Sequence, residues 1–228
     1  KDPNPEFQEK ITKCINEMKK DKLLEEKEAS YLVKGEIQTP RFYGLPKIHK
    51  LFDKIPPFRP IVSGCSSCCE KISNLVDFYL KPLTRKNKSY VKDTTDFVKK
   101  ISGIECKEGD ILVSADVTGL YTVISHEEGI AACQEALEQR PNNNKEKMPT
   151  SKIVQLITII LQSNCFTFLG RFFHQVTGTA MGTPMAPSYA NLYMGKIETD
   201  MLREYEELTG LRPTLWLRYL DIFFHWIH

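Results

Sequence analysis

Hydrophobic residues recur every three to four positions in several segments of this chain, which is the spacing of an amphipathic helix. Between residues 6 and 20 they fall on one helical face, with lysines and glutamates opposite. The same spacing occurs from residue 68 to 79, with an end near Pro82, and from 151 to 163. A long helical pattern follows Pro187. The apolar positions of the first and last helix are Phe7, Ile11, Cys14, Ile15 and Met18, then Ala190, Met194, Ile197, Met201, Tyr205 and Leu208. Four helices are predicted from periodicity alone.

Polar residues mark where further elements begin and end. The run Ser125-His126-Glu127-Glu128 is typical of a capping box, so a helix is predicted to start there. Thr150 or Ser151 is the predicted cap of the apolar helix that follows. Residues 84–93 are predicted to form a lysine-rich connection, and residues 141–147 a polar loop.

Short apolar runs favour strands instead. Residues 111–115 predict a buried strand because the run is brief and follows polar residues. Residues 166–173 predict a hairpin around a glycine, and 215–220 with 222–227 predict a second one. Between residues 39 and 64 five prolines alternate with basic residues, which predicts an extended, loop-rich and basic segment. The predicted fold class is α+β.

Composition limits the classes of protein that this chain can represent. At 228 residues it can form one large or two small domains. No apolar run reaches the roughly 18 to 20 residues needed to span a bilayer, so no membrane span is expected. Lys+Arg is 31 against Asp+Glu 29, so the net charge of +2 favours a polyanionic partner only weakly. The chain begins at Lys1 without an initiator Met, and we expect an internal fragment of a longer reading frame.

Cysteines and histidines offer two candidate zinc ligand pairs. Seven cysteines at irregular spacing fit reduced thiols in an intracellular protein. Cys65 and Cys68 form a C-x-x-C that could supply half a zinc site, but no second pair follows at zinc spacing, so buried thiols on a helix are the preferred interpretation. His225 and His228 are three apart on a predicted strand and would face opposite sides, which disfavours a shared metal.

Two aspartates end predicted strands. Asp116 closes the run at 111–115, and Asp221 lies in the turn between the last two strands. If these strands are neighbours in one sheet, both carboxylates emerge at the same edge. Such a pair suits Mg²⁺, which binds one or two carboxylates and fills its other positions with water and substrate phosphates. The alternative is that each aspartate is an ordinary turn or cap residue.

Five sequence blocks together resemble the reverse transcriptases of Penelope-like retroelements. The blocks are Phe42-Tyr43-Gly44-Leu45-Pro46-Lys47-Ile48-His49-Lys50, Phe58-Arg59-Pro60-Ile61-Val62-Ser63, Ser114-Ala115-Asp116-Val117-Thr118-Gly119-Leu120-Tyr121-Thr122, Gly178-Thr179-Ala180-Met181-Gly182-Thr183-Pro184-Met185-Ala186-Pro187 and Leu217-Arg218-Tyr219-Leu220-Asp221-Ile222-Phe223-Phe224. They occur in the family's order and span residues 42 to 224, so the resemblance covers most of the chain.

The resemblance implies a right-hand polymerase fold with fingers and palm, in which the palm sheet packs on helices. Residues 1–40 would be a helical extension that leads into the fingers, 41–110 the fingers, and 111–228 the palm with some fingers elements. A thumb is expected to be absent because the chain stops soon after the last hairpin. The implied activity is RNA-directed DNA polymerase: addition of deoxynucleotides to a primer 3′-hydroxyl by two-metal phosphoryl transfer.

The resemblance also implies roles for individual residues. Asp116 and Asp221 would be catalytic metal ligands for Mg²⁺, with Mn²⁺ as an alternative ion, and the Val117 carbonyl would be a further ligand. The other implied positions all contact the nucleotide: Lys47 and Arg59 at the triphosphate, Tyr121 beneath the sugar, and Met181 with Gly182 beneath the nascent base pair. Each has a plainer interpretation, since charges are usually solvated and an aromatic residue is usually part of the core.

The last block departs from the family pattern, which has two consecutive aspartates. Here Ile222 directly follows Asp221, and loss of one Asp codon is the simplest explanation. One metal-binding carboxylate is missing as a result, and we expect impaired activity. A one-residue deletion would also shorten the turn or shift the alternation of the following strand.

Two functions therefore remain open. The first is a polymerase with a primed RNA or DNA template and deoxynucleoside triphosphates as partners, without a membrane, and in the nucleus if it acts as a retroelement product. The second is a non-catalytic, degenerate fragment that retains nucleic-acid binding through its basic segments.

Overall fold

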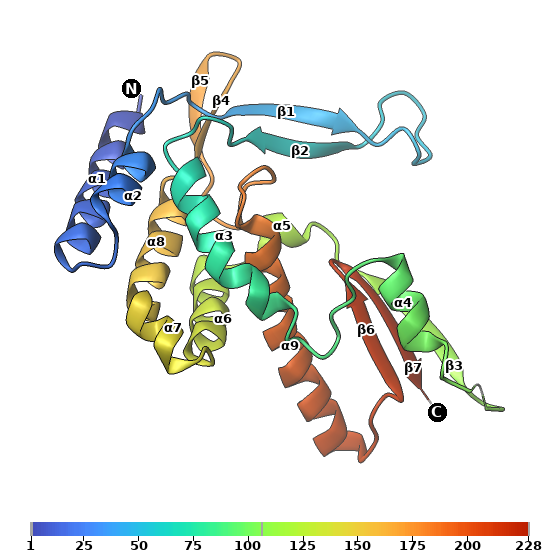
Figure 1. Cartoon of the computed structure of the whole chain (residues 1–228). Helices are drawn as coiled ribbons and strands as arrows, with labels where there is room; N and C mark the ends of the chain where they lie inside the picture. Colours follow the sequence, from blue (N-terminus) through green and yellow to red (C-terminus); the bar gives the residue numbers. More distant parts are fainter. Residues whose placement is uncertain (1, 106, 228) are drawn as a thin grey trace.

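The computed structural model describes residues 2–105 and 107–227, with side chains as far as Ile222. Three parts are visible: a helical body, a mixed four-stranded sheet above it, and a separate three-stranded antiparallel sheet (Figure 1). In chain order the elements are α1 Asn4–Lys20, α2 Glu26–Val33, β1 Arg41–Pro46, β2 Phe58–Ser63, α3 Glu70–Thr84, α4 Thr94–Ile101, β3 Ile111–Asp116, α5 Leu120–Val123, α6 His126–Glu138, α7 Asn142–Lys147, α8 Thr150–Gln162, β4 Cys165–Phe168, β5 Arg171–His174, α9 Ala186–Thr209, β6 Leu215–Tyr219 and β7 Ile222–Ile227. The predicted α+β class is confirmed.

The helical body is held together by apolar side chains. The stripe predicted on α1 is buried at every position, and α3, α6, α8 and the first half of α9 pack into the same core. Ile72, Leu156 and Ile157 are among its fully enclosed residues. Each such side chain contributes about 1.5–3 kcal/mol on burial. Hydrophobic periodicity therefore located this part of the molecule correctly.

The four-stranded sheet has the strand order β2-β1-β4-β5. β1 pairs antiparallel with β2 and parallel with β4, and β4 and β5 form the predicted hairpin. The segment at 39–64 is thus less loop-like than predicted, because two of its stretches pair with each other and satisfy their backbone groups. Pro60 is tolerated because β2 is an edge strand, where a missing N–H costs no ladder hydrogen bond on the open side.

The three-stranded sheet has the order β3-β7-β6. β3 forms one edge of this sheet and, within the described residues, pairs with β7 alone. The sequence predicted a buried strand here, and that prediction is wrong: Ile111 is 60% exposed and Leu112 64%. A short apolar run was read as interior, but an edge strand keeps much of its side-chain surface in contact with solvent.

Several local predictions are also corrected. Ser125 is the N-cap of α6, but its side chain makes no capping hydrogen bond, so the capping box does not form. α8 begins after Pro149 with no side-chain cap from Thr150 or Ser151. Residues 142–147 form α7 rather than a loop. The short helices α2 and α4 had no predicted counterpart, because eight residues carry too few apolar repeats to reveal a period.

The molecule is open rather than spherical. Its accessible surface is 14259 Å², whereas a compact protein of this mass would expose about 10,600 Å². The C-terminal half of α9 extends beyond the body (Figure 1), and Met201 and Leu208 are exposed there although the sequence placed them on an apolar face. Among the described residues, no helix combines the length and apolar character needed to cross a membrane.

Candidate active site

The two aspartates lie on neighbouring segments of the three-stranded sheet. Asp116 is the last residue of β3 and is paired with Ile222, the first residue of β7. One step further, the Val117 N–H donates to the Asp221 carbonyl at 3.0 Å. Asp116 and Asp221 are therefore diagonal neighbours at one edge of the sheet, as the sequence predicted for adjacent strands. Val117, the residue after Asp116, links the two segments through this backbone hydrogen bond.

Asp221 is held in a tight two-residue turn. Tyr219 pairs with Ile222, which leaves only Leu220 and Asp221 in the connection between β6 and β7. Leu220 has φ +56°, a left-handed conformation that is unusual for a residue with a side chain. A positive φ at this position is what a two-residue hairpin turn requires, and here a leucine adopts it where glycine or asparagine is usual.

Ile222 takes the place directly opposite Asp116. Cross-strand partners in an antiparallel pair project to the same face of the sheet, so an apolar, exposed side chain stands beside the Asp116 carboxylate. Strand β7 starts without a break at this residue, and the turn before it has two residues. Ile222 thus places an apolar side chain next to Asp116 while the hairpin remains regular.

The carboxylates fit a hard cation. Among the described residues, neither Asp116 nor Asp221 makes a side-chain hydrogen bond or ion pair with another residue, so their oxygen atoms have no protein cation to neutralise them. Carboxylate oxygens are the ligands that Mg²⁺ and Mn²⁺ prefer. The described part of the chain contains no cluster of three or more histidine, cysteine, aspartate or glutamate residues suited to a metal. Two carboxylates can anchor such an ion only together with water and substrate oxygens.

Tyr121 lies close to this pair. It belongs to the one-turn helix α5 and packs with its ring half-buried against the core. Burial raises the pKa of its phenol, and the negative charge of Asp221 raises that pKa further. The Tyr121 phenol and the Asp221 carboxylate are therefore near enough to interact electrostatically.

A short segment connects this region to the four-stranded sheet. The Thr179 N–H donates to the Tyr121 carbonyl at 2.7 Å, and the Val62 N–H on β2 donates to the Met181 carbonyl at 3.0 Å. A Cβ on Gly178 would lie 2.4 Å from the Tyr121 carbonyl oxygen, and one on Gly182 would lie 2.3 Å from that of Val62. Both glycines also have positive φ, so only glycine allows this double backbone contact. We call residues 178–182 the bridging segment.

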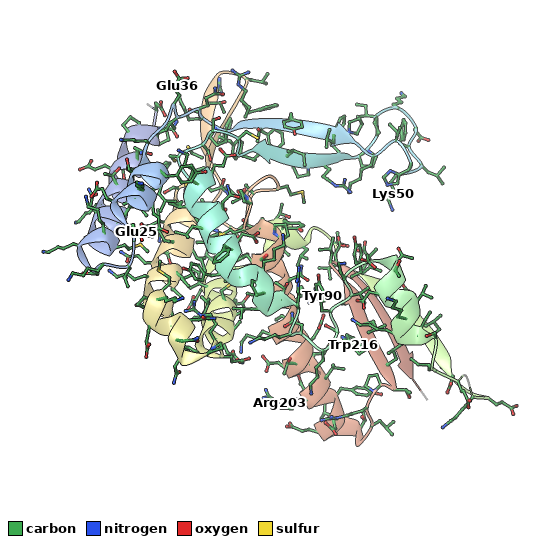
Figure 2. All side chains as sticks on the ribbon, viewed as in Figure 1. Glu25, Glu36, Lys50, Tyr90, Arg203 and Trp216 are labelled. Atoms are coloured by element: carbon green, nitrogen blue, oxygen red, sulfur yellow. The ribbon has the colours of Figure 1, made fainter. Side chains whose placement is uncertain are left out.

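The basic residues predicted to bind triphosphate lie on the β1–β2 hairpin. Arg59 is exposed on β2 opposite Leu45, and Lys47 follows β1 with its N–H bonded to the Pro57 carbonyl at 2.8 Å. Strand alternation puts Lys47 and Arg59 on the same face of the hairpin. The exposed loop beyond them, with Lys50 near its tip (Figure 2), adds further positive charge. The bridging segment ties the base of this hairpin to Tyr121.

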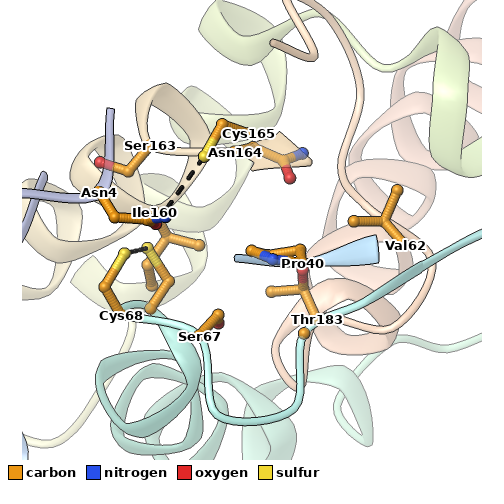
Figure 3. Close-up of a pocket in the computed structure, with 12 residues that line it drawn as sticks. Asn4, Pro40, Val62, Ser67, Cys68, Ile160, Ser163, Asn164, Cys165 and Thr183 are labelled. Carbon is orange, nitrogen blue, oxygen red and sulfur yellow. Dashed lines mark hydrogen bonds between the residues drawn. The ribbon is translucent and has the colours of Figure 1, made fainter. Parts of the chain in front are cut away.

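Among the described residues, the cysteines lie away from the aspartate pair. Cys65 is exposed, whereas Cys68 and Cys69 are buried just before α3, beside Cys165 (Figure 3). These buried cysteines line a cavity of about 20 Å³, which has room for about one water molecule and none for a nucleotide. Burial raises the pKa of the Cys165 thiol to about 11. The prediction of buried thiols on a helix is thus confirmed only for burial of Cys68 and Cys69, since these two residues precede α3 and Cys65 is exposed. His225 and His228 lie outside the residues with described side chains.

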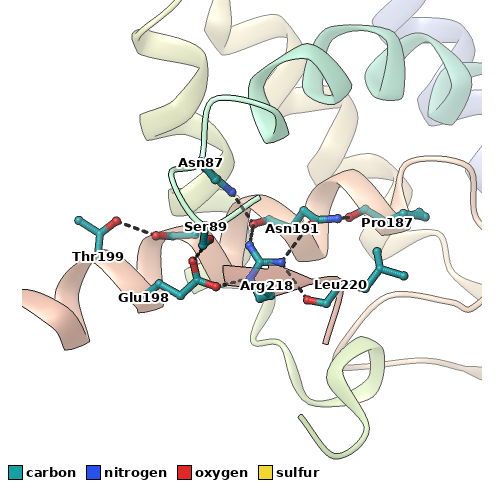
Figure 4. A network of polar contacts seen from close by, with 9 residues as sticks. Asn87, Ser89, Pro187, Asn191, Glu198, Thr199, Arg218 and Leu220 are labelled. Carbon is teal, nitrogen blue, oxygen red and sulfur yellow. Dashed lines mark hydrogen bonds and ion pairs between the residues drawn. The ribbon is translucent and has the colours of Figure 1, made fainter. Parts of the chain in front are cut away.

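One group of site residues had no predicted role. Arg218, on β6 two positions before the turn, is 1% exposed and forms an ion pair with Glu198 on α9 (Figure 4). Its guanidinium also donates to Asn191 and to the Leu220 carbonyl. A signal was present in the sequence: Asn191 and Glu198 are seven residues apart, so they interrupt the apolar face of α9 with polar side chains at helical spacing.

Comparison with known proteins identifies the fold. No protein-family model matches the chain, and no curated protein matches it significantly. Solved structures do. Telomerase from Candida albicans, in complex with the TWJ fragment of telomeric RNA, superposes with a TM-score of 0.60 at 11% identity over 87% of this chain and 39% of that chain. Apo telomerase from Candida tropicalis, truncated from the C-terminal domain, superposes with a TM-score of 0.59 at 11% identity over 86% of this chain and 44% of that chain.

These likenesses define a reverse-transcriptase-like fold, an α+β structure in which sheets pack on helices. At 11% identity the likeness concerns the fold. The chain spans about two fifths of the length of the telomerase chains that it matches.

Proposed function

We propose that this chain contains the fingers and palm of an RNA-directed DNA polymerase. The observation that carries the proposal is the connection of Asp116, Asp221 and Tyr121 to the basic β1–β2 hairpin through the bridging segment. Carboxylates for a metal and basic side chains for phosphates are thereby linked across two different sheets. The reverse-transcriptase-like fold supports the same conclusion.

In this proposal each residue acts on one part of the substrate. Asp116 and Asp221, with the Val117 carbonyl, hold Mg²⁺ or Mn²⁺; the bound ion supplies charge neutralisation and alignment at the phosphates. Arg59 and Lys47 bind the triphosphate, since a guanidinium donates a fork of hydrogen bonds and an ammonium acts as a point charge. Tyr121, Met181 and Gly182 contact the rest of the nucleotide.

Tyr121 and the bridging segment select and orient the incoming nucleotide. The half-buried ring of Tyr121 would pack beneath the sugar and exclude a 2′-hydroxyl. Met181 and Gly182 would lie beneath the nascent base pair, where the absent Cβ of Gly182 lets the backbone approach closely. Replacement of Tyr121 by alanine should therefore admit ribonucleotides, and unchanged sugar selectivity would contradict this role.

The wider assignment follows from the same proposal. Residues 1–40 lead into fingers formed by 41–110, and 111–228 form the palm with some fingers elements. The five sequence blocks favour an origin in a Penelope-like retroelement, with a primed RNA or DNA template and deoxynucleoside triphosphates as partners and the nucleus as the place of action. The telomerase neighbour that was solved with an RNA fragment is consistent with a nucleic-acid partner.

The experiment is primer extension with Mg²⁺ by four versions of the chain: unaltered, Ile222→Asp, Ile222→Asn and a version with Asp inserted after Asp221. Ile222→Asp restores a carboxylate opposite Asp116, and Ile222→Asn is its neutral match in size. We expect extension roughly 100-fold faster for Ile222→Asp than for Ile222→Asn, because loss of one group that stabilises transition-state charge slows an enzyme by about this factor.

The inserted version tests the alternative that one codon was lost. Its extension rate should exceed that of Ile222→Asp if the active hairpin needs the following strand shifted by one residue. Its rate should be lower than that of Ile222→Asp if the present register is the active one. Adding Asp116→Ala to the more active version should abolish extension. Equal rates for Ile222→Asp and Ile222→Asn, or unchanged rates with Asp116→Ala, would overturn the proposed metal site.

A second function is favoured by Ile222 itself, which leaves Asp116 beside an apolar side chain. In this case the chain binds nucleic acid without catalysis. A labelled RNA–DNA duplex should then bind with an affinity that falls with salt, and Arg59→Gln with Lys47→Gln should weaken binding and flatten the salt dependence. Lys196→Gln on α9, where the lysine pairs with Glu135, is the matched control and should bind as the unaltered chain does.

A further inference from the structure

The turn that carries Asp221 is attached to the helical body through one buried side chain. Arg218 donates from Nη1 to the Leu220 carbonyl at 2.9 Å, and Leu220 is the turn residue with φ +56°. The same guanidinium donates from Nε to Glu198, and from Nη1 to the Asn191 Oδ1 at 2.7 Å. Both acceptors are on α9. A planar guanidinium with fixed donor directions can bond to the turn and the helix at once.

The partners of Arg218 are themselves fixed. Glu198 is 4% exposed and also accepts a hydrogen bond from the Ser89 hydroxyl. Asn191 donates from its side chain to the Pro187 carbonyl at 3.0 Å, and its own carbonyl accepts from Arg218 Nη2 at 3.2 Å and from Asn87 Nδ2 at 3.1 Å. The acceptors are therefore held in place by α9 and by the connection after α3.

The backbone of Arg218 is fixed as well. Its N–H donates to the Ser89 carbonyl at 2.7 Å, and its carbonyl accepts from the Val91 N–H at 3.0 Å. Tyr90, between Ser89 and Val91, forms a parallel bridge with Arg218. β6 is thus tied along its outer side, while β7 connects it to β3.

We propose that Arg218 is a positioning residue that sets the place of Asp221 relative to Asp116. The chain of contacts runs from Glu198 and Asn191 on α9 through the guanidinium to the Leu220 carbonyl, and then one residue further to Asp221. On the other side, the Asp221 carbonyl accepts from Val117, the residue after Asp116. This inference rests on the proposed function in so far as Asp116 and Asp221 are taken to bind a catalytic metal. That Arg218 fixes the turn can be tested whether or not the chain is a catalyst.

Simple stabilisation is a poorer explanation of this network. A buried ion pair often contributes no more than apolar residues of the same size would, because both charges must leave water. What apolar side chains cannot supply is a directed hydrogen bond to the carbonyl of a strained turn. The network therefore serves geometry rather than net stability.

The test uses the Val117 amide, whose hydrogen bond to Asp221 reports on the turn. The variants are Arg218→Met with Glu198→Met, which replaces the pair by apolar side chains, and Arg218→Lys, which keeps the charge but loses the fork. The double variant Lys196→Met with Glu135→Met removes an exposed pair from the same helix and is the matched control. Hydrogen exchange is followed by NMR at Val117 and, for comparison, at Thr179, whose amide bonds to Tyr121.

We expect Val117 to exchange about ten-fold faster or more in both Arg218 variants, with Thr179 and the control double variant unchanged. The Arg218 substitutions should also weaken the affinity for Mn²⁺ about ten-fold, both in the otherwise unaltered chain and in the Ile222→Asp chain, as substitutions of other residues that orient metal ligands do. Unchanged Val117 exchange in a folded Arg218 variant would overturn the inference, and so would equal acceleration at Val117 and Thr179, since that would indicate a purely structural role.

The two proposals fail in different ways. If neither the unaltered chain nor Ile222→Asp binds Mn²⁺, the proposed metal site is wrong, whereas the exchange rates still decide whether Arg218 positions the turn. If Mn²⁺ binds with equal affinity to the Arg218 variants, the positioning inference is wrong and the proposed function is unaffected.

Discussion

The helical body and the three-stranded sheet of this protein are stabilised in different ways. The body encloses a continuous apolar core that receives side chains from α1, α3, α6, α8 and α9. The sheet leaves much of β3 exposed and is joined to the body by the buried polar contacts of Arg218 together with the packing of Trp216. Apolar packing supplies stability without direction, whereas hydrogen bonds to fixed donors select one orientation. The three-stranded sheet carries the two aspartates, and its orientation depends on these directional hydrogen bonds.

The largest expected effect comes from breaking the polar attachment. Arg218→Met leaves Glu198 as a buried charge without its partner and should lower the free energy of unfolding by about 3–5 kcal/mol. Chemical denaturation followed by circular dichroism measures it. The paired Arg218→Met and Glu198→Met change should recover most of this loss, and a single variant as stable as the unaltered chain would show that the attachment has little energetic importance.

The matching change in the body is Leu156→Ala, at a fully enclosed position of α8. Removal of the side chain leaves a cavity and should cost roughly 2–5 kcal/mol. In contrast to the Arg218 variants, Val117 and Thr179 should keep the same ratio of exchange rates, because a core cavity does not touch the turn. A change in that ratio would indicate that the two regions are more tightly coupled than their contacts suggest.

Two leucines, each at the first position of a two-residue hairpin turn, sharpen the comparison. Leu169 in the β4–β5 turn has φ +47° and is 85% exposed, while Leu220 has φ +56° and is 38% exposed. Glycine at either position removes the strain of the left-handed conformation, so Leu169→Gly should stabilise the fold by about 0.5–1 kcal/mol. Leu220→Gly should gain less because it gives up part of a covered side chain. Thermal unfolding measures both, and a loss of stability in Leu169→Gly would contradict the strain argument.

The smallest expected effect is a pH dependence at Tyr121. Burial and then the charge of Asp221 raise the pKa of this phenol in the folded state. The unfolded chain, with a tyrosine pKa of about 10, therefore releases its proton first, and stability falls as the pH rises above that value. Asp221→Asn should lower the pKa of Tyr121 without returning it to the ordinary value, because burial remains. Ultraviolet titration, with Tyr121→Phe as the reference, measures the pKa of the Tyr121 phenol. An unchanged pKa in Asp221→Asn would show that the two side chains do not interact.

The sequence predicted the body better than the sites of attachment. Periodicity identified α1 and α8 because their buried faces repeat over several turns. It placed β3 in the interior, since an apolar run does not reveal whether a strand lies at an edge. The capping box at Ser125 also failed to form, although the residues that favour it are present. Local preference is weak wherever a tertiary contact competes with it.

For the candidate site, the chain by itself determined the chemistry. The identities of Asp116, Asp221, Tyr121 and Arg59, the glycines of the bridging segment and the apolar residue at 222 can all be read from the sequence, because each depends only on residue type and order. The tertiary structure decided their arrangement. Only pairing between β3 and β7 brings Asp116 to the turn at Asp221, and only the fold encloses Arg218 with Glu198 and directs its guanidinium to Leu220. These contacts join residues that are far apart in the chain, and such distances are set by packing of the whole molecule rather than by any local pattern.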